Sequence, residues 1–422
     1  MKRLALIACI AVSGVFCFVA VGQQVKLSFW KFAATVDDPI IAKYVDEWNS
    51  LHPETQVEFT TMPWGDYIGL ALPAAFAAGQ GPDIFWLSPG DILRYVNEGM
   101  LLPFDEYMTK DELDDLVPAA RQRPTVEGVL YGLPVEIEPV AIYYNVDLFE
   151  QYGLAVPKDW DELLDVAKKL TTPERYGLII ETIPSYYQLF TWYPFLWSAG
   201  ADVMTPDWKK ATMDTEGAIA ALKLWGDLIR NGLSPSSTPT STSDILSNFA
   251  AGLGAMQVCG MWAIAALAAQ PPDFRVGVFP VPPLKAGMPS ISVFGGWTFV
   301  VNKQTPHPKE AVEFCKWIIF KTDFLKEFCV DRMAKLPSRL SVLEAGKAQY
   351  AQNPLAQVFV ERILPSARPE PRFPPDIAKI LMDALSGVMF GGVPAEQAAR
   401  IANAQIQAFL DTYKGRVGAY SY

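Results

Sequence analysis

Two carboxylates stand out in this sequence because their type and spacing could do chemistry. Glu136 and Glu138 lie two positions apart in the segment Val-Glu-Ile-Glu-Pro, so in an extended strand they share one face. Side by side they can accept hydrogen bonds from a polar ligand, whereas the acid and base of a glycosidase must flank a bond from opposite sides. A solvated strand edge is the alternative for both residues.

The tryptophans best placed to contact a ligand lie at strand ends or beside glycine. Ligands collect beyond the carboxyl ends of sheet strands, and an indole there offers an apolar face together with an N–H group. We expect five tryptophans at a binding cleft: Trp30, Trp64, Trp86, Trp262 and Trp297. Three others lie in apolar segments and are expected in the core: Trp192, Trp197 and Trp225.

Other catalytic signals are sparse. The two histidines, His52 and His307, each precede a proline in what we interpret as a surface turn. There is no Gly-x-Ser-x-Gly, no phosphate-binding glycine loop and no Cys-x-x-Cys pair. Arg372, in Pro-Arg-Phe-Pro, could offer a planar guanidinium group to hydroxyls or carboxylates, or it could lie on the surface. These observations favour a binding protein without catalytic residues, metal or cofactor.

The elements that must position these residues begin with an α/β unit. Residues 25–29 alternate apolar and polar side chains, as a half-buried strand does, and residues 56–60 repeat the pattern. Between them, Asp38 is a candidate N-cap with Pro39 at the first helical position. A strand, helix and strand in this order predict a largely parallel sheet.

The N-terminus and the composition indicate a secreted protein with an acidic surface. Residues 1–22 carry two basic residues and then an apolar run, as a cleavable signal peptide does; an uncleaved membrane anchor is the alternative. Without them the formal charge changes from −11 to −13, which argues against nucleic acid as a partner. The remaining length is too great for one core and predicts two lobes. Cys259, Cys315 and Cys329 remain, and we expect buried free thiols rather than a Cys315–Cys329 disulfide.

Six motifs occur in an order that resembles one family. They are PWGDY (63–67), GPDIFW (81–86), YGLPVEIEPVAIYYNVDLF (131–149), AGLGAMQVCGMW (251–262), FGGWTFVVNK (294–303) and LPSRLSVL (336–343). Together they resemble the extracellular solute-binding proteins that include the maltose and multiple-sugar receptors of ABC importers. The resemblance covers nearly all of the chain after residue 22.

The resemblance implies an α/β fold of two lobes, like that of periplasmic binding proteins, with a hinge and a ligand cleft between the lobes. By analogy, the first lobe comprises residues 23–133 and 280–335, and the second comprises 134–279 and 336–422. The lobes would close around a mono- or oligosaccharide, and the protein would deliver it to membrane permease subunits. The expected protein is a monomer in the periplasm or on the outer face of the cell membrane.

The resemblance also adds two candidates and leaves the ligand open. Tyr187 resembles a position that contacts ligand in some relatives, and Ser88 stands where relatives often have an aspartate. Either Glu136 or Glu138 matches the carboxylate that accepts hydrogen bonds from sugar hydroxyls. A polyamine or a glycerol phosphate is the alternative ligand, since paired carboxylates framed by tryptophans also suit a cation.

Overall fold

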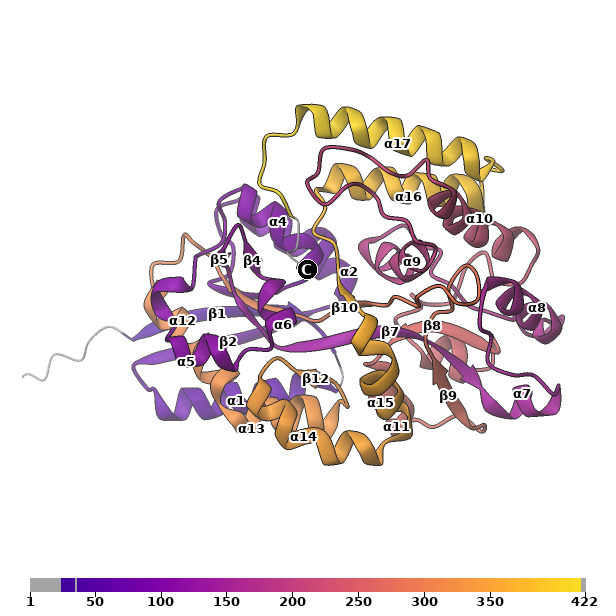
Figure 1. The fold of residues 1–422 in the computed structure, drawn as a ribbon. Helices are drawn as coiled ribbons and strands as arrows, with labels where there is room; N and C mark the ends of the chain where they lie inside the picture. Colours follow the sequence, from indigo (N-terminus) through magenta and orange to yellow (C-terminus); the bar gives the residue numbers. More distant parts are fainter. Residues whose placement is uncertain (1–23, 35, 419–422) are drawn as a thin grey trace, which may run out of the picture.

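The computed structural model describes residues 24–34 and 36–418, which form two units, each built on its own β-sheet. The units lie side by side, and strand β7 (Glu136–Asn145) runs from the first toward the second (Figure 1). The expected signal peptide, residues 1–22, lies outside the described residues. None of the described helices combines the length and the apolar character that crossing a membrane requires.

The first sheet has the order β2-β1-β3-β11-β6. Strand β1 pairs in parallel with β2 and β3, and β11 is antiparallel to β3 and β6. The bounds of these strands are β1 (Val25–Phe32), β2 (Thr55–Met62), β3 (Ile84–Leu87), β6 (Leu133–Pro134) and β11 (Thr298–Val301). The predicted strand, helix and strand are confirmed, although both strands extend beyond the residues predicted for them, 25–29 and 56–60.

The helices of the first unit cover both faces of this sheet. They are α1 (Asp37–Leu51), α2 (Trp64–Asp66), η1 (Tyr67–Ala71), α3 (Leu72–Ala77), α4 (Pro89–Asn97), η2 (Asp105–Tyr107), α5 (Lys110–Asp115), α6 (Pro118–Gln122), α12 (Pro308–Phe320), α13 (Thr322–Leu325) and η4 (Lys326–Arg332). The prediction that Asp38 caps α1 is wrong, because the helix starts at Asp37. The Asp38 carboxylate instead accepts a hydrogen bond from the Ala34 N–H at 2.9 Å and pairs with Lys31.

The second sheet is organised around the long strand β7. Its other strands are β8 (Met256–Gly260), β9 (Val276–Phe279), β10 (Val293–Gly295), β12 (Leu336–Pro337) and β13 (Arg368–Pro369). All of them pair with β7 except β13, which pairs with β10. A separate hairpin joins β4 (Thr125–Val126) to β5 (Val129–Leu130).

The remaining helices belong to the second unit (Figure 1). They are α7 (Val146–Gln151), α8 (Trp160–Leu170), α9 (Tyr186–Ser198), α10 (Glu216–Arg230), η3 (Leu246–Ala250), α11 (Ala263–Ala269), α14 (Leu340–Gln352), α15 (Pro354–Val358), η5 (Phe359–Ile363), η6 (Leu364–Ser366), α16 (Pro375–Met389) and α17 (Ala395–Thr412). The three tryptophans predicted for the core, Trp192, Trp197 and Trp225, are buried in this unit. The three cysteines are buried and free, as expected: Cys259, Cys315 and Cys329.

The chain passes between the two sheets more than once. It goes from β6 of the first sheet to β7 of the second near residue 134. It returns after β10, because β10 still pairs with β7 and the next strand, β11, belongs to the first sheet. Near residue 336, β12 joins β7, but α14 packs on η4 and Arg339 pairs with Asp115 of the first unit at 2.7 Å.

Candidate functional site

Three aromatic rings of the first unit stand at the end of its sheet nearest the second unit. Phe32 ends β1, Trp86 lies in β3 and Trp297 lies between β10 and β11. The ring centroids of Phe32 and Trp297 are 4.4 Å apart, and those of Trp86 and Trp297 are 6.4 Å apart with an angle of 15° between their planes. Trp86 is fully buried, whereas Trp297 is half-buried. Trp297 is therefore the indole of this group with surface left for a ligand.

Three rings of the second unit form a matching group. Tyr187 and Phe190 lie on α9, and Trp262 immediately precedes α11. The centroid of Trp262 is 6.0 Å from that of Tyr187 and 6.4 Å from that of Phe190. The Trp262 indole N–H donates to the Ser243 carbonyl at 3.0 Å, and the Tyr187 hydroxyl is buried with no hydrogen-bond partner among the described residues.

Gly295, two positions before Trp297, packs against the second group. A Cβ atom on this residue would lie 3.0 Å from the Phe190 ring and 3.8 Å from a carboxylate oxygen of Glu370. The structure thus places the predicted residues in two aromatic groups, Trp86 with Trp297 and Tyr187 with Trp262.

The paired carboxylates of β7 lie in the protein interior, so the alternative of a solvated strand edge is wrong. Glu136 accepts a hydrogen bond from the Trp297 backbone N–H at 2.6 Å, and its second oxygen has no hydrogen-bond partner among the described residues. Glu138 pairs with Lys335 at 3.1 Å. Burial raises the pKa of Glu136 to about 8 and raises that of Glu138, although Lys335 opposes both shifts.

Two buried lysines balance part of this negative charge. Lys335 also approaches Asp37 at 3.8 Å, and the neighbouring carboxylates raise its pKa despite its burial. Lys31 pairs with Asp38 at 2.6 Å and places its Nζ 5.0 Å from the Trp86 ring centroid. Burial lowers the pKa of Lys31, against the pull of both aspartates. Our reading of the sequence missed both lysines.

Arg123 and Gly296 fix the backbone beside Trp297. The Arg123 guanidinium donates to the Gly296 carbonyl at 2.9 Å and to the Glu136 carbonyl. Gly296 has a φ of 123°, and a Cβ atom there would lie 2.1 Å from the backbone carbonyl oxygen of Glu136. Only glycine fits this position, which holds the indole of Trp297 against the end of the first sheet.

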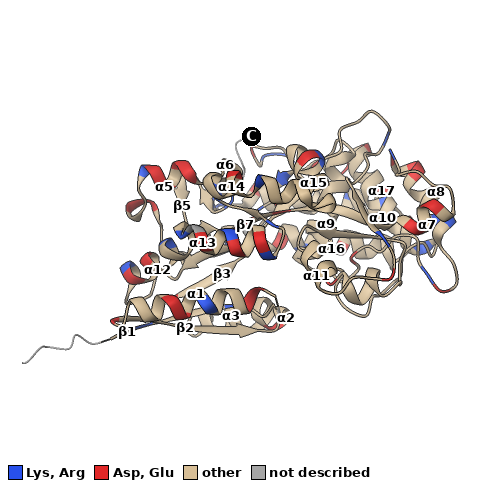
Figure 2. Cartoon of the chain, turned by 90° about the horizontal axis from the view of Figure 1, so that it is seen from below, with Lys and Arg blue, Asp and Glu red and all other residues tan. Residues whose placement is uncertain are grey.

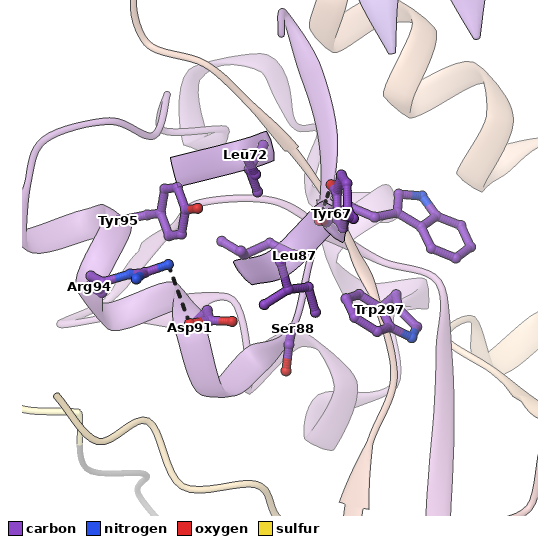
Figure 3. Close-up of a pocket in the computed structure, with 10 residues that line it drawn as sticks. Tyr67, Leu72, Leu87, Ser88, Asp91, Arg94, Tyr95 and Trp297 are labelled. Carbon is purple, nitrogen blue, oxygen red and sulfur yellow. Dashed lines mark hydrogen bonds and ion pairs between the residues drawn. The ribbon is translucent and has the colours of Figure 1, made fainter. Parts of the chain in front are cut away.

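A small hollow lies in the first unit at this boundary (Figure 3). Figure 3 shows Ser88 and Asp91 between Arg94 on one side and Trp297 on the other. About 10 Å³ of the hollow is open to the centre of a water molecule, which is room for one water and not for a sugar ring.

Ser88 and Asp91 connect this hollow to the second unit. The Ser88 hydroxyl donates to Glu370 at 3.3 Å, and a Cβ atom on Gly90 would lie 2.8 Å from the same carboxylate. Burial raises the pKa of Glu370 to about 8 and also raises that of Asp91, although Arg94 lies 3.6 Å from Asp91. Asp91, Arg94 and Glu370 are further residues that our sequence reading missed.

The remaining candidates are Trp30, Trp64 and Arg372. Trp30 is half-buried in β1, and Trp64 starts α2 with 41% of its surface exposed. Arg372 is buried, so its surface alternative is wrong; it donates to the backbone carbonyls of Arg123 at 3.0 Å and Gly418 at 3.2 Å. Its side chain holds chain segments together, and these two bonds give it a structural role.

The described residues hold no cluster of three or more side chains that could ligate a metal. Glu136 and Glu138 stand side by side on one strand, and His52 stacks on Trp48 with ring centroids 3.7 Å apart. Figure 2 shows acidic and basic residues interspersed along the outer helices of both units. The arrangement suits capture of a solute between two walls.

Comparison with known proteins identifies the class. Residues 33–322 match the family described as bacterial extracellular solute-binding protein, and the chain belongs to this family. A solute-binding protein of an ABC transporter from Thermotoga lettingae, bound to alpha-D-tagatose, has 25% identity and a TM-score of 0.82, over 92% of this chain and all of that one. The resemblance drawn from the six motifs and the two-lobe fold are therefore confirmed.

Two curated relatives are named for sugars. The maltotriose-binding protein of Pyrococcus abyssi is 28% identical, over 72% of this chain and 65% of that protein. The multiple sugar-binding protein of Streptococcus mutans is 25% identical, over 70% of this chain and 71% of its own length. Maltose-bound MalE3 of T. maritima shares the fold, with a TM-score of 0.78 at 22% identity.

Proposed function

We propose that this protein captures a neutral mono- or oligosaccharide between its two units and delivers it to the permease of an ABC importer. The observation that carries the proposal is the pair of aromatic groups around Trp297 and Trp262, one on each wall, beside buried carboxylates. Sugar rings present C–H faces that pack on indoles and hydroxyls that donate to carboxylates. Relatives named for sugars support the same class of ligand.

In this proposal, Trp297 and Trp262 pack against the sugar, while Glu136 exchanges a hydrogen bond with one of its hydroxyls. Glu136 Oε2 is buried with no hydrogen-bond partner among the described residues. A buried polar atom without a partner is costly, so a ligand hydroxyl at this oxygen would recover a hydrogen bond.

A hinge is part of the proposed mechanism: a sugar enters an opened form, and closure then brings the two aromatic groups together. The chain crosses between the units at β6–β7, at β10–β11 and again between η4 and β12, and these crossings are the natural hinge segments. The protein would act outside the cytoplasm, in the periplasm or on the outer face of the membrane, as a monomer and without catalysis.

A cationic solute such as a polyamine is the second candidate. Glu136, Glu138 and Asp37 gather near Lys335, and Asp91 and Glu370 form a second buried acidic pair. A cation would be attracted to the carboxylates and to the faces of the tryptophans. The first candidate is favoured because Lys31, Lys335 and Arg123 already offset part of the charge beside Trp86 and Trp297.

Titration calorimetry tests the proposal. The purified protein would be titrated with maltotriose, maltose, D-tagatose, spermidine and glycerol 3-phosphate. We expect binding of at least one sugar at one site, with no sugar cleaved after prolonged incubation. Binding of spermidine and of none of the sugars would favour the second candidate, a receptor for a cationic solute. Release of a hydrolysed product would contradict both candidates.

A further inference from the structure

The residues after the last helix leave the second unit and run along the first (Figure 1). Helix α17 packs on α10 and α16 of the second unit. Tyr413 continues this packing, with its ring 5.1 Å from Phe409 and 5.8 Å from Trp208. We call residues 413–418 the C-terminal strap.

The strap is hydrogen-bonded to the end of α4 in the first unit. The side-chain amide of Asn97, the last residue of α4, donates to the Tyr413 hydroxyl at 2.9 Å. The side-chain oxygen of Asn97 accepts from the Arg416 backbone N–H at 3.0 Å. The Tyr413 hydroxyl in turn donates to the Arg416 carbonyl at 2.8 Å. One asparagine thus holds both ends of a short turn in the strap.

A second attachment joins the strap to the β4–β5 hairpin and to the residue that follows it. Arg416 donates to the Tyr131 hydroxyl at 3.0 Å and lies 3.8 Å from the Glu127 carboxylate. Its guanidinium is 5.9 Å from the Tyr131 ring. Tyr131 stands just before β6 and the first crossing, so this attachment lies close to a hinge segment.

The third attachment wedges the strap between the units. A Cβ atom on Gly418 would lie 3.0 Å from Leu93 of α4 and 3.0 Å from the ring of Trp208 in the second unit. It would also lie 2.5 Å from the Arg372 carbonyl. The Gly418 carbonyl accepts from Arg372 at 3.2 Å. A residue without a side chain is needed at this point of contact.

We propose that the C-terminal strap ties the two units in their closed arrangement and sets how far the cleft opens without a ligand. The strap is anchored on α17 and Trp208 of the second unit and on Asn97, Tyr131 and Leu93 of the first. These contacts form in an arrangement in which Ser88 of the first unit touches Glu370 of the second. Contacts made in one conformation stabilise that conformation over the others.

The strap changes the population of open molecules, which is a property separate from the identity of the solute. The proposal rests on the two-unit mechanism, but its test uses no ligand. A failed sugar titration would therefore leave the result on the strap unaffected, and a failed strap test would leave the sugar proposal standing.

Distance measurements between spin labels test the strap. Labels on Glu58→Cys in β2 and Lys168→Cys in α8 report on the two units, and both positions are exposed. We expect a chain ending at Thr412 to show a broader distance distribution with a new population at longer distance. Small-angle scattering of the same protein should show a larger radius of gyration. An unchanged distribution in a folded truncated protein would overturn the proposal.

Point variants keep the test decisive if the truncated chain does not fold. Arg416→Ala and Asn97→Ala each remove one attachment, and exposed Arg400→Ala on α17 is the matched control. We expect both strap variants to lengthen the label distance and the control to leave it unchanged. Their effects should be less than additive, because Arg416 and Asn97 contact each other. Equal distances in all three variants would show that the strap does not restrain the units.

Discussion

The two walls of the boundary between the units differ in how their side chains are held. The wall of the first unit combines indoles with a buried set of charges, in which Lys31 and Lys335 face aspartates and glutamates. The wall of the second unit, around Tyr187 and Trp262, consists of aromatic rings beside the buried thiol of Cys259. Ion pairs hold the side chains of the first wall, and apolar packing holds those of the second. Mutations in the two walls should therefore lower the unfolding free energy for different physical reasons.

The largest expected effect comes from the charged wall. Lys335→Met would leave the carboxylates of Asp37 and Glu138 buried without their shared partner. Breaking a buried ion pair in this way costs about 3–5 kcal/mol of unfolding free energy. Denaturant unfolding measures the loss, and Lys168→Met on the exposed face of α8 is the control. A loss below about 1 kcal/mol would mean that the network does not hold the first wall.

The packing behind the second wall should show a loss of similar size without any charge. Trp192 on α9 is fully buried, and its indole donates to the Ala221 carbonyl at 3.4 Å. We expect Trp192→Ala to lower the unfolding free energy by roughly 3–5 kcal/mol, as a large cavity does. Thermal and denaturant unfolding measure it. A stable variant that no longer binds solute would reverse the division between core and cleft tryptophans.

The pH dependence tests the charged wall further, because Glu136 is a buried carboxyl with a raised pKa. A carboxyl whose pKa is higher in the folded state adds stability at low pH and loses it as the pH rises toward that pKa. Glu136, with an unfolded value near 4.5 and a folded value of about 8, should make unfolding easier between about pH 5 and 8. We expect Glu136→Gln to flatten this part of the stability curve by at least about 1 kcal/mol. An unchanged slope would contradict the raised pKa.

The first wall also shows what the sequence can and cannot predict. The glycines and tryptophans of the GGW and GMW motifs carry a signal, since a glycine turn beside an indole is rare in a helix or a strand interior. Lys31 carried a weaker signal that we missed: it falls in the buried register of β1, two residues after Phe29. A lysine in that register predicts a buried partner, because an unpaired buried charge is too costly.

Other features depend on contacts between distant parts of the chain, which periodicity does not reveal. Lys335, Asp91 and Glu370 come to the site only through the fold. Lys335 lies beside β7, and Glu370 of the second unit lies beside the start of α4, which carries Asp91. The boundary at residue 280 was expected by analogy with the family, and β10 extends the second sheet to Gly295. Strand order, and not local composition, decides where the chain returns.

The smallest expected effect is on binding, at Trp262 and Trp297, one indole from each aromatic group. Trp262 and Trp297 are both half-buried, so truncation of either removes ligand contact while most of the surrounding core remains. We expect Trp262→Ala and Trp297→Ala each to weaken sugar binding by at least about 1 kcal/mol, with the fold retained. Calorimetry with the sugar that binds best measures the loss, and circular dichroism checks the fold. Because Trp297 also packs on Phe32 and Trp86 in the charged wall, its variant should lose some stability, whereas Trp262→Ala should lose little. Full affinity in both variants would remove the aromatic walls from the binding site, even though the family and the two-lobe fold would stand.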